Sequence, residues 1–248
     1  MGAIFRNIRL TIEYDGTNYH GWQRQANAVT VQEEIEKAAR KLTGKECDLI
    51  GSSRTDEGVH ALGHVANFHT DSSIPADKFS FALNTVLPGD ITIKDSQEVS
   101  PDFHSRFSAK GKKYRYLIYN SRQPSALLRN RAMHVCQSLD FDSMKRAAEH
   151  LKGTHDFTCF RASGSTVKTS ERTIWDVRLS RDGELIFFEI SGDGFLYNMV
   201  RIIVGTLVYV GIGKIAAEEI PEIIESKDRK KAGKTAPPQG LYLVEVYY

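Results

Sequence analysis

The segment KAARKLTG at residues 37–44 is repeated in outline by RAAEHLKG at residues 146–153. Two adjacent alanines, a leucine and a closing glycine occupy matching places, and the second segment begins 109 residues after the first. Both segments lie in stretches with helical spacing of apolar residues, 30–44 and 140–153. A repeat of this kind indicates an internal duplication and predicts two lobes of similar construction.

The first helical stretch also carries end signals. In TVQEEIEKAARKLTG (30–44), Thr30 and Glu33 have the spacing of a capping box, and Gly44 is suited to end the helix. Apolar spacing predicts further helices over 195–213 and 216–226. Strands are expected at 8–16, 46–51, 64–70 and 114–120, and as a hairpin with an Asp182-Gly183 turn over 175–192.

The order of these elements predicts the fold class. Strand, helix and strands are followed by strand, helix, strands and helix, which is an α+β pattern. The chain has 248 residues, a length comfortable for two domains. We therefore expect an N-terminal α+β lobe over 1–105 and a C-terminal α+β lobe over 106–248.

The composition is that of an ordinary soluble globular protein, with 41% apolar and 26% charged residues. The longest strongly apolar stretch, residues 199–213, contains Arg201 and three glycines, so it is too interrupted for a membrane span. The three cysteines, Cys47, Cys136 and Cys159, lie far apart and form no CxxC pair. They are expected to be reduced thiols of a cytoplasmic protein.

Positive charge is concentrated in one part of the chain. The net charge is only +2, yet residues 103–139 contain no Asp or Glu. Tyr114, Tyr116 and Tyr119 alternate with cations in this segment, a combination that suits base stacking beside phosphate contact. The alternative is a solvated loop whose counter-charges lie elsewhere. The basic residues are Arg106, Lys110, Lys112, Lys113, Arg115, Arg122, Arg129 and Arg131.

The polar segment GSSRTDEGVH, residues 51–60, separates two apolar strands and contains Asp56. Asp followed by Gly is a turn signal, and Arg54 is a candidate surface partner for the carboxylate. A carboxylate held ionised beside a guanidinium is also what a nucleophile or general base requires. Composition and spacing leave the turn, ion-pair and catalytic interpretations open.

Metal and nucleotide sites are not favoured by the remaining motifs. His60, His64 and His69 follow Asp56, but VANFHT predicts a strand and no HExxH motif is present. The sequence also lacks the phosphate-binding GxxxxGK[ST] motif and the GxSxG motif of many serine hydrolases. No metal is expected.

Several long segments together resemble the tRNA pseudouridine synthases of the TruA family. RTDEGVHALGHVANF resembles the signature segment of that family. The other matching segments occur in family order along the chain: YDGTNYHGWQRQ (14–25), DFHSRFSAKGKKYRYLIYN (102–120), FLYNMVRIIVGTL (195–207) and APPQGLYLVEVYY (236–248).

The resemblance implies a fold and a reaction. The fold would be two RNA-recognition or ferredoxin-like lobes whose antiparallel sheets join across a central basic cleft, in a homodimer. The reaction would convert uridine to pseudouridine at positions 38, 39 and 40 of the tRNA anticodon stem-loop, with no cofactor. It would break the N1–C1′ bond, turn the uracil and rejoin it through C5.

The resemblance also implies roles for single residues. Asp56 matches the catalytic aspartate, and Tyr114 matches the tyrosine that packs on the target uracil. Arg54 matches the arginine expected to displace or hold the flipped base, and Arg201 matches the basic residue expected to pair with the aspartate. Arg106, Lys110, Lys112, Lys113 and Arg115 are expected to contact RNA. A non-catalytic tRNA-binding protein and a hydrolase using Asp56 with a nearby histidine stay open as alternatives.

Overall fold

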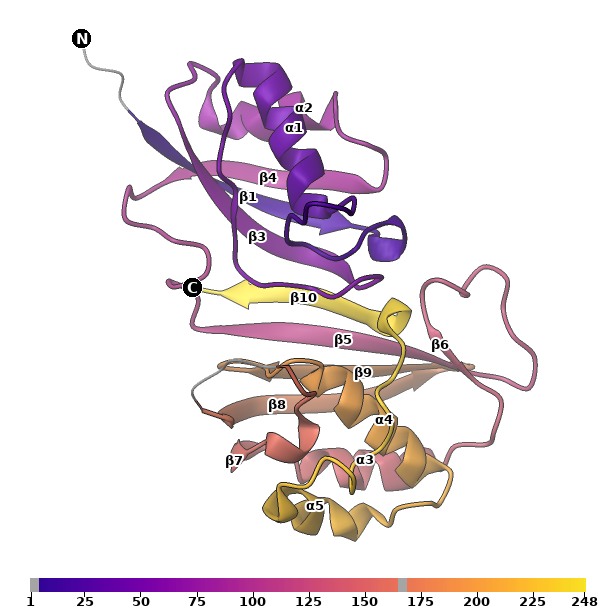
Figure 1. The fold of residues 1–248 in the computed structure, drawn as a ribbon. Coiled ribbons are helices and arrows are strands. Elements are labelled where there is room, and N and C mark those ends of the chain that lie inside the picture. Colours follow the sequence, from indigo (N-terminus) through magenta and orange to yellow (C-terminus); the bar gives the residue numbers. More distant parts are fainter. Residues whose placement is uncertain (1–4, 165–168) are drawn as a thin grey trace. The chain divides into compact units, whose positions relative to one another are not determined.

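The structure is a computed structural model that describes residues 5–164 and 169–248. Its helices and strands alternate in an α+β arrangement, which confirms the predicted fold class (Figure 1). The chain forms two compact units. The first unit consists of two segments, the chain up to Lys110 and the C-terminal Tyr242–Tyr248, and the second unit is Gly111–Leu241. The division into domains at 1–105 and 106–248 stays a prediction, because a compact unit is not by itself an independently folding domain.

The first unit contains a ferredoxin-like βαββαβ arrangement. In its sheet β1 lies between β4 and β3, and both neighbours are antiparallel to it. The short β2 adds to β3, and β10 pairs with the start of β3 in parallel. The elements are β1 (Arg6–Tyr14), α1 (Val31–Thr43), β2 (Ile50–Gly51), β3 (His60–Thr70), α2 (Phe79–Asn84), β4 (Ile91–Val99) and most of β10 (Leu241–Tyr247).

The second unit has a related order, in which β5, α3, β8, β9 and α4 follow one another and β6 and β7 are added strands. Its strands run β5-β9-β8-β7, each antiparallel to its neighbour, and β6 adds to β5 in parallel. The elements are β5 (Gly111–Asn120), β6 (Met133–Val135), α3 (Phe141–Glu149), β7 (Gly153–Asp156), β8 (Glu171–Asp182), β9 (Leu185–Gly192), α4 (Met199–Gly211) and α5 (Ile220–Ser226).

The duplicated segments form the first helix of each unit. Ala38 and Ala39 of α1 are buried, as are Ala147 and Ala148 of α3. Small side chains let each helix lie close to its own sheet, so the matching alanines serve matching packing contacts. This supports the predicted duplication. In its unit, α1 lies beside α2, whereas α3 lies beside α4 and β8 (Figure 1).

The predicted ends of α1 are largely confirmed. Thr30 Oγ1 accepts a hydrogen bond from Glu33 N at 3.4 Å, and Gly44 ends the helix with φ of +72°. The Glu33 carboxylate lies 3.1 Å from Lys37 Nζ, so this acidic side chain pairs along the helix. The cap therefore uses the Thr30 hydroxyl, as N-terminal threonines commonly do.

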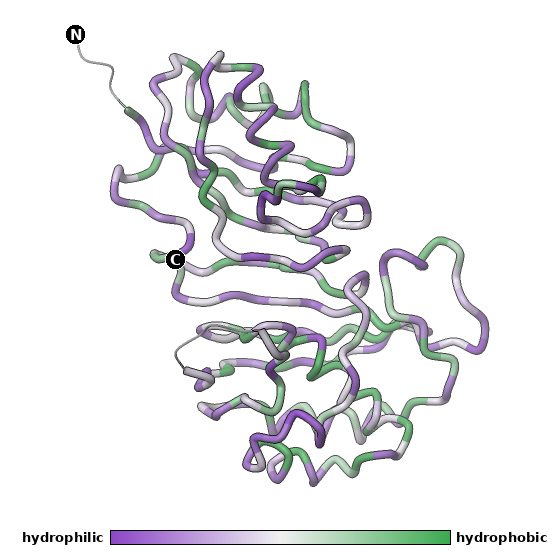
Figure 2. Tube along the Cα trace, viewed as in Figure 1, coloured by the Kyte–Doolittle hydropathy of each residue, from purple (hydrophilic) through white to green (hydrophobic). Residues whose placement is uncertain are grey.

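Alternating burial produces the core of each unit. Along β1, Ile8, Leu10, Ile12 and Tyr14 face inward, and along β5 Tyr116 and Ile118 do the same. Apolar residues, green in Figure 2, are spread through both units rather than gathered in one of them. Because successive side chains of a strand point to opposite faces, the residues between these buried ones lie on the other face of the sheet, where polar side chains can be placed.

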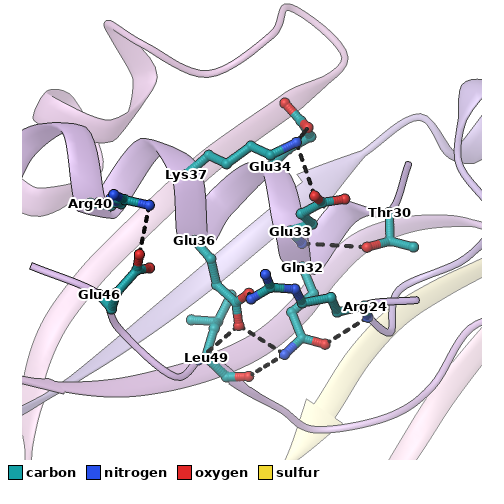
Figure 3. Close-up of polar contacts among 10 residues, drawn as sticks. All are labelled: Arg24, Thr30, Gln32, Glu33, Glu34, Glu36, Lys37, Arg40, Glu46 and Leu49. Carbon is teal, nitrogen blue, oxygen red and sulfur yellow. Dashed lines mark hydrogen bonds and ion pairs between the residues drawn. The ribbon is translucent and has the colours of Figure 1, made fainter. Parts of the chain in front are cut away.

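A buried carboxylate, Glu36, is the centre of a hydrogen-bond network in the first unit, drawn in Figure 3. Glu36 is 7% exposed and accepts hydrogen bonds from Leu49 N at 3.2 Å and Gln32 Nε2 at 3.0 Å. Arg24 Nη1 lies 3.3 Å from the same carboxylate. Gln32 Oε1 also accepts from Arg24 N at 3.0 Å. Glu36 and Gln32 therefore fasten the segment that contains Arg24, and the segment that leads into β2, to helix α1.

Replacing Glu36 by alanine is expected to lower the melting temperature. The Leu49 N–H loses its buried acceptor, and a polar group left in this way costs about 1–3 kcal/mol. Glu46→Ala is the matched control, because that carboxylate is 71% exposed and pairs with Arg40 at the surface. An exposed ion pair contributes at most about 1 kcal/mol. Thermal unfolding compares the two variants, and equal melting temperatures would contradict the importance of burial here.

Candidate active site

Asp56 lies at the start of a closed turn in the loop between β2 and β3. Val59 N donates to Asp56 O at 3.2 Å, and Gly58 adopts φ of +73°, a conformation that glycine tolerates best. Gly58 N also donates to Tyr19 O at 3.3 Å. Asp56 itself is half-buried. The backbone is thus a turn, as one interpretation of the sequence required, but it is a turn tied to a neighbouring segment.

That neighbouring segment, residues 14–22, holds the residue directly before Asp56. Trp22 N donates to Thr55 O at 3.2 Å, and the hydroxyls of Tyr14 and Thr55 are 2.7 Å apart. Both hydroxyls belong to buried side chains. Main chain and side chain of Thr55 are therefore both fixed, which limits how far Asp56 can move.

Two glycines allow this close contact. A Cβ atom on Gly21 would lie 2.3 Å from Thr55 O, and one on Gly16 would lie 2.0 Å from Val59 O. Gly21 also has φ of +85°. Any larger residue would push the aspartate loop away. This gives the YDGTNYHGWQRQ motif a structural role that sequence reasoning missed, although its two glycines were the available signal.

The three histidines near Asp56 have separate structural surroundings. His60 Nδ1 accepts from Gly16 N at 3.0 Å, and its ring stacks on Tyr242. His64 stacks on Trp22 with ring centroids 3.7 Å apart. His69 lies on the exposed side of β3. Within residues 5–164 and 169–248 no group of three or more His, Cys, Asp and Glu side chains is placed to hold a metal ion.

Arg54 and Asp56 are brought together on one loop of the first unit. The Arg54 side chain is exposed, and Ser53 Oγ donates to Arg54 O at 3.4 Å. Thr55, between them, is buried. The exposed Arg54 guanidinium can extend from the loop toward a bound polyanion. The Asp56 carboxylate, which is half-buried and on a shorter side chain, lies closer to the backbone of the loop.

Tyr114 belongs to the second unit, where it lies on β5. It is 7% exposed, and its ring meets Phe195 edge to face at a centroid distance of 5.0 Å. Phe195 comes from the segment that precedes α4. The preferred edge-to-face geometry fixes the plane of the Tyr114 ring.

Arg201 lies in the first turn of α4, also in the second unit. Its Nε donates to Ala236 O at 2.8 Å, and its Nη1 donates to Asn198 Oδ1 at 2.8 Å. Asn198 has φ of +59°, which asparagine tolerates better than most residues. The guanidinium is consequently held in one orientation by the FLYNMVR segment and by the chain that leads to β10.

The expected basic segment is partly neutralised inside the second unit. Arg115 Nη2 lies 2.7 Å from one Glu189 oxygen, and Lys113 Nζ lies 3.3 Å from the other. Burial tends to raise the pKa of Glu189, but hydrogen bonds from Arg115 and Lys113 outweigh it and lower that pKa. Arg106, Lys110 and Lys112 are the other predicted contacts, and the first two are exposed.

Two of the tyrosines that alternate with these cations have internal partners. The buried Tyr116 hydroxyl donates to Pro237 O at 2.6 Å. The Tyr119 hydroxyl donates to Glu184 Oε2 at 2.8 Å. The hydroxyls of Tyr116 and Tyr119 are therefore engaged in the fold of the second unit, as the Tyr114 ring is by its contact with Phe195.

The fold and these loops define an α+β protein with a rigidly held aspartate turn in one unit and a fixed tyrosine and arginine in the other. The family model described as tRNA pseudouridine synthase matches residues 10–108 and 147–248. The chain belongs to this family.

Relatives of high identity extend over nearly the whole chain. The chain is 69% identical to tRNA pseudouridine synthase A of Acetivibrio thermocellus and 60% identical to that of Ruminiclostridium cellulolyticum. Each match covers 98% of this chain and 100% of the relative. One solved structure, an archaeal box H/ACA sRNP Nop10–Cbf5 complex, matches with a TM-score of 0.38 and 10% identity, over 81% of this chain and 44% of that one.

Among the described residues, none of the helices has the length and apolar character needed to cross a membrane. The longest of them, α1 and α4, have 13 residues each.

Proposed function

We propose that this protein isomerises uridine to pseudouridine in tRNA, at positions 38, 39 and 40 of the anticodon stem-loop, with Asp56 as the catalytic group. The observation that carries the proposal is the half-buried Asp56 on a turn whose neighbours are fixed by hydrogen bonds to residues 14–22. Membership of the tRNA pseudouridine synthase family supports the reaction and the substrate class.

The proposed reaction needs no external reactant. The N1–C1′ bond breaks, the uracil turns, and a C5–C1′ bond forms, while C5 loses a proton and N1 gains one. All atoms of the nucleotide are conserved, so the reaction requires a base and a positioned nucleophile or carboxylate rather than a redox cofactor. Asp56 supplies that carboxylate.

The target base must leave the helical stack before it can turn. Extruding a paired base costs a few kcal/mol. Arg54 is exposed and close to Asp56 in sequence, so it is suited to occupy the vacated space or hold the extruded base. Tyr114 is the aromatic ring proposed to stack on the extruded base, and Arg201 is the basic residue that the family resemblance proposes as the partner of the aspartate.

Action at three adjacent positions favours recognition of shape and phosphates over base edges. Arg106 and Lys110 are exposed and available for phosphate contacts in the first unit. We also propose that the protein acts in the cytoplasm as a homodimer, in keeping with the family resemblance. Sedimentation of the purified chain tests the dimer directly.

The activity is tested by incubating the protein with unmodified tRNA and mapping pseudouridine by carbodiimide-dependent primer-extension stops. Stops at positions 38, 39 and 40 are the expected result. Tight tRNA binding without any stop would favour a non-catalytic binding protein. Released uracil or a cut strand would favour a hydrolase and contradict the proposal.

Tyr114→Ala is expected to weaken tRNA binding more than Tyr114→Phe. Stacking of one base on an aromatic ring is worth about 1–3 kcal/mol, and phenylalanine keeps the ring. Filter binding measures both variants well below their melting temperatures, because removal of a buried ring also destabilises the fold. Equal affinities of the Phe and Ala variants would show that stacking is not the role of Tyr114.

A further inference from the structure

A buried hydrogen bond joins Tyr14, at the end of β1, to Thr55, the residue beside Asp56. The Tyr14 hydroxyl lies 2.7 Å from Thr55 Oγ1. Tyr14 is 3% exposed and Thr55 is 9% exposed, so water does not readily replace either partner. A hydrogen bond in such surroundings is stronger than one at the surface, and its loss leaves a buried polar group unpaired.

The position of Tyr14 is fixed by strand pairing and by aromatic packing. Tyr14 is the last residue of β1 and is paired with Ile91 of β4 and Ala61 of β3. Its ring lies 6.2 Å from the ring of Trp22, and the backbone N–H of Trp22 donates to the Thr55 carbonyl. The hydroxyl is therefore fixed by a central strand and by aromatic packing, whereas Thr55 and Asp56 belong to a loop.

We propose that Tyr14 is a positioning residue for the reaction, acting through Thr55 on the Asp56 carboxylate. The inference rests on the proposed function, because it assumes that Asp56 is the catalytic group. A reacting group on a loop needs support from rigid elements to stay within a fraction of an ångström of its productive position. Misplacement by about 1 Å can cost on the order of 100-fold in rate.

The decisive variant is Tyr14→Phe, which keeps the ring and its packing and removes one oxygen atom. We expect kcat for pseudouridine formation to fall by about 10- to 100-fold, because the carboxylate samples unproductive positions. KM and the tRNA dissociation constant should change by less than about twofold, since neither hydroxyl is required to contact RNA for this role.

A double-mutant cycle combines Tyr14→Phe with Thr55→Val, which removes the other hydroxyl of the same hydrogen bond. If the two hydroxyls act only through this bond, the double variant should be no slower than either single variant. Thr55→Ser keeps the hydroxyl and should retain most of the parent kcat. Additive losses in the double variant would mean that the two hydroxyls act independently, and would overturn the proposal.

Tyr248→Phe is the matched control, because its hydroxyl also forms a hydrogen bond inside the first unit, donating to Ser105 O at 2.8 Å, and neither partner belongs to the aspartate loop. Its kcat should equal that of the parent. If Tyr14→Phe lowers only the melting temperature and keeps the parent kcat at lower temperature, the bond serves folding alone and the proposal fails.

Asp56→Asn is assayed beside these variants to separate two kinds of failure. An active Asp56→Asn protein would defeat the proposed function itself. An inactive Asp56→Asn protein together with parent-like kcat in Tyr14→Phe would defeat only the positioning role. Loss of kcat in both, with tRNA affinity kept, is the expected result.

Discussion

Asp56→Asn is expected to fold normally, bind tRNA with near-parent affinity and form no detectable pseudouridine. Asparagine keeps the shape of the side chain and tolerates the same turn dihedrals, so the backbone bond from Val59 N to Asp56 O should survive. What is lost is the negative charge and the nucleophilic or basic oxygen. Filter binding and release of tritium from C5 of labelled uridine, on one tRNA preparation, measure the two properties separately.

A turn residue with no chemical role would give a different result. Asp182 is the last residue of β8, directly before the β8–β9 turn, so Asp182→Asn shows what the same substitution costs next to a turn outside the candidate site. We expect parent-like tritium release from that control. Substantial tritium release by Asp56→Asn would return Asp56 to a structural role, and the proposed reaction would lose its central group.

The strongest local patterns were sufficient to predict the first helix of each unit and the β8–β9 hairpin. The capping residue Thr30 and the helix-ending Gly44 act within a few residues of themselves, so neighbouring sequence determines their structure. The hairpin also depends on a local signal, because Gly183 adopts φ of +56°. Asp182 pairs with Leu185, so the two turn residues are Gly183 and Glu184, one position later than the predicted Asp182-Gly183 turn.

Elements that depend on distant partners were predicted poorly. Of the strand expected over 46–51 only Ile50–Gly51 pairs with β3, since the preceding residues bond instead to the side chains of α1. β4 was not predicted at all, although it pairs along nearly the whole of β1. The seven C-terminal residues return to the first unit, a connection that no local pattern reveals.

The candidate site shows the same division. The four positions Asp56, Arg54, Tyr114 and Arg201 came from motif resemblance, and their roles stay predictions. The supports around Asp56 were not predicted, because the glycines of residues 14–25 can be read from the sequence, but the carbonyl oxygens that they contact, those of Thr55 and Val59, lie far along the chain and are identified only by the structure. Arg115 and Lys113 similarly gave a basic pattern in sequence, whereas their shared partner Glu189 lies on another strand.

Gly21→Ala is expected to reduce pseudouridine formation by about 100-fold or more, because a methyl group at this position would force the Thr55 carbonyl away. The new Cβ would lie 2.3 Å from Thr55 O, and both atoms belong to or adjoin backbone, so a side-chain rotation cannot relieve the overlap. The displaced Thr55 takes Asp56 with it. Initial rates of tritium release measure the effect.

Gly44→Ala separates this displacement from simple backbone strain. Gly44 has φ of +72°, close to the +85° of Gly21, but a Cβ there would meet nothing within 4 Å. Both variants pay about 1–2 kcal/mol for a left-handed alanine, and only Gly21→Ala also moves the aspartate loop. Gly44→Ala should therefore lower the melting temperature slightly and keep parent activity at lower temperature. Full activity in both variants would mean that the contact between the Gly21 segment and Thr55 does not determine where the carboxylate acts.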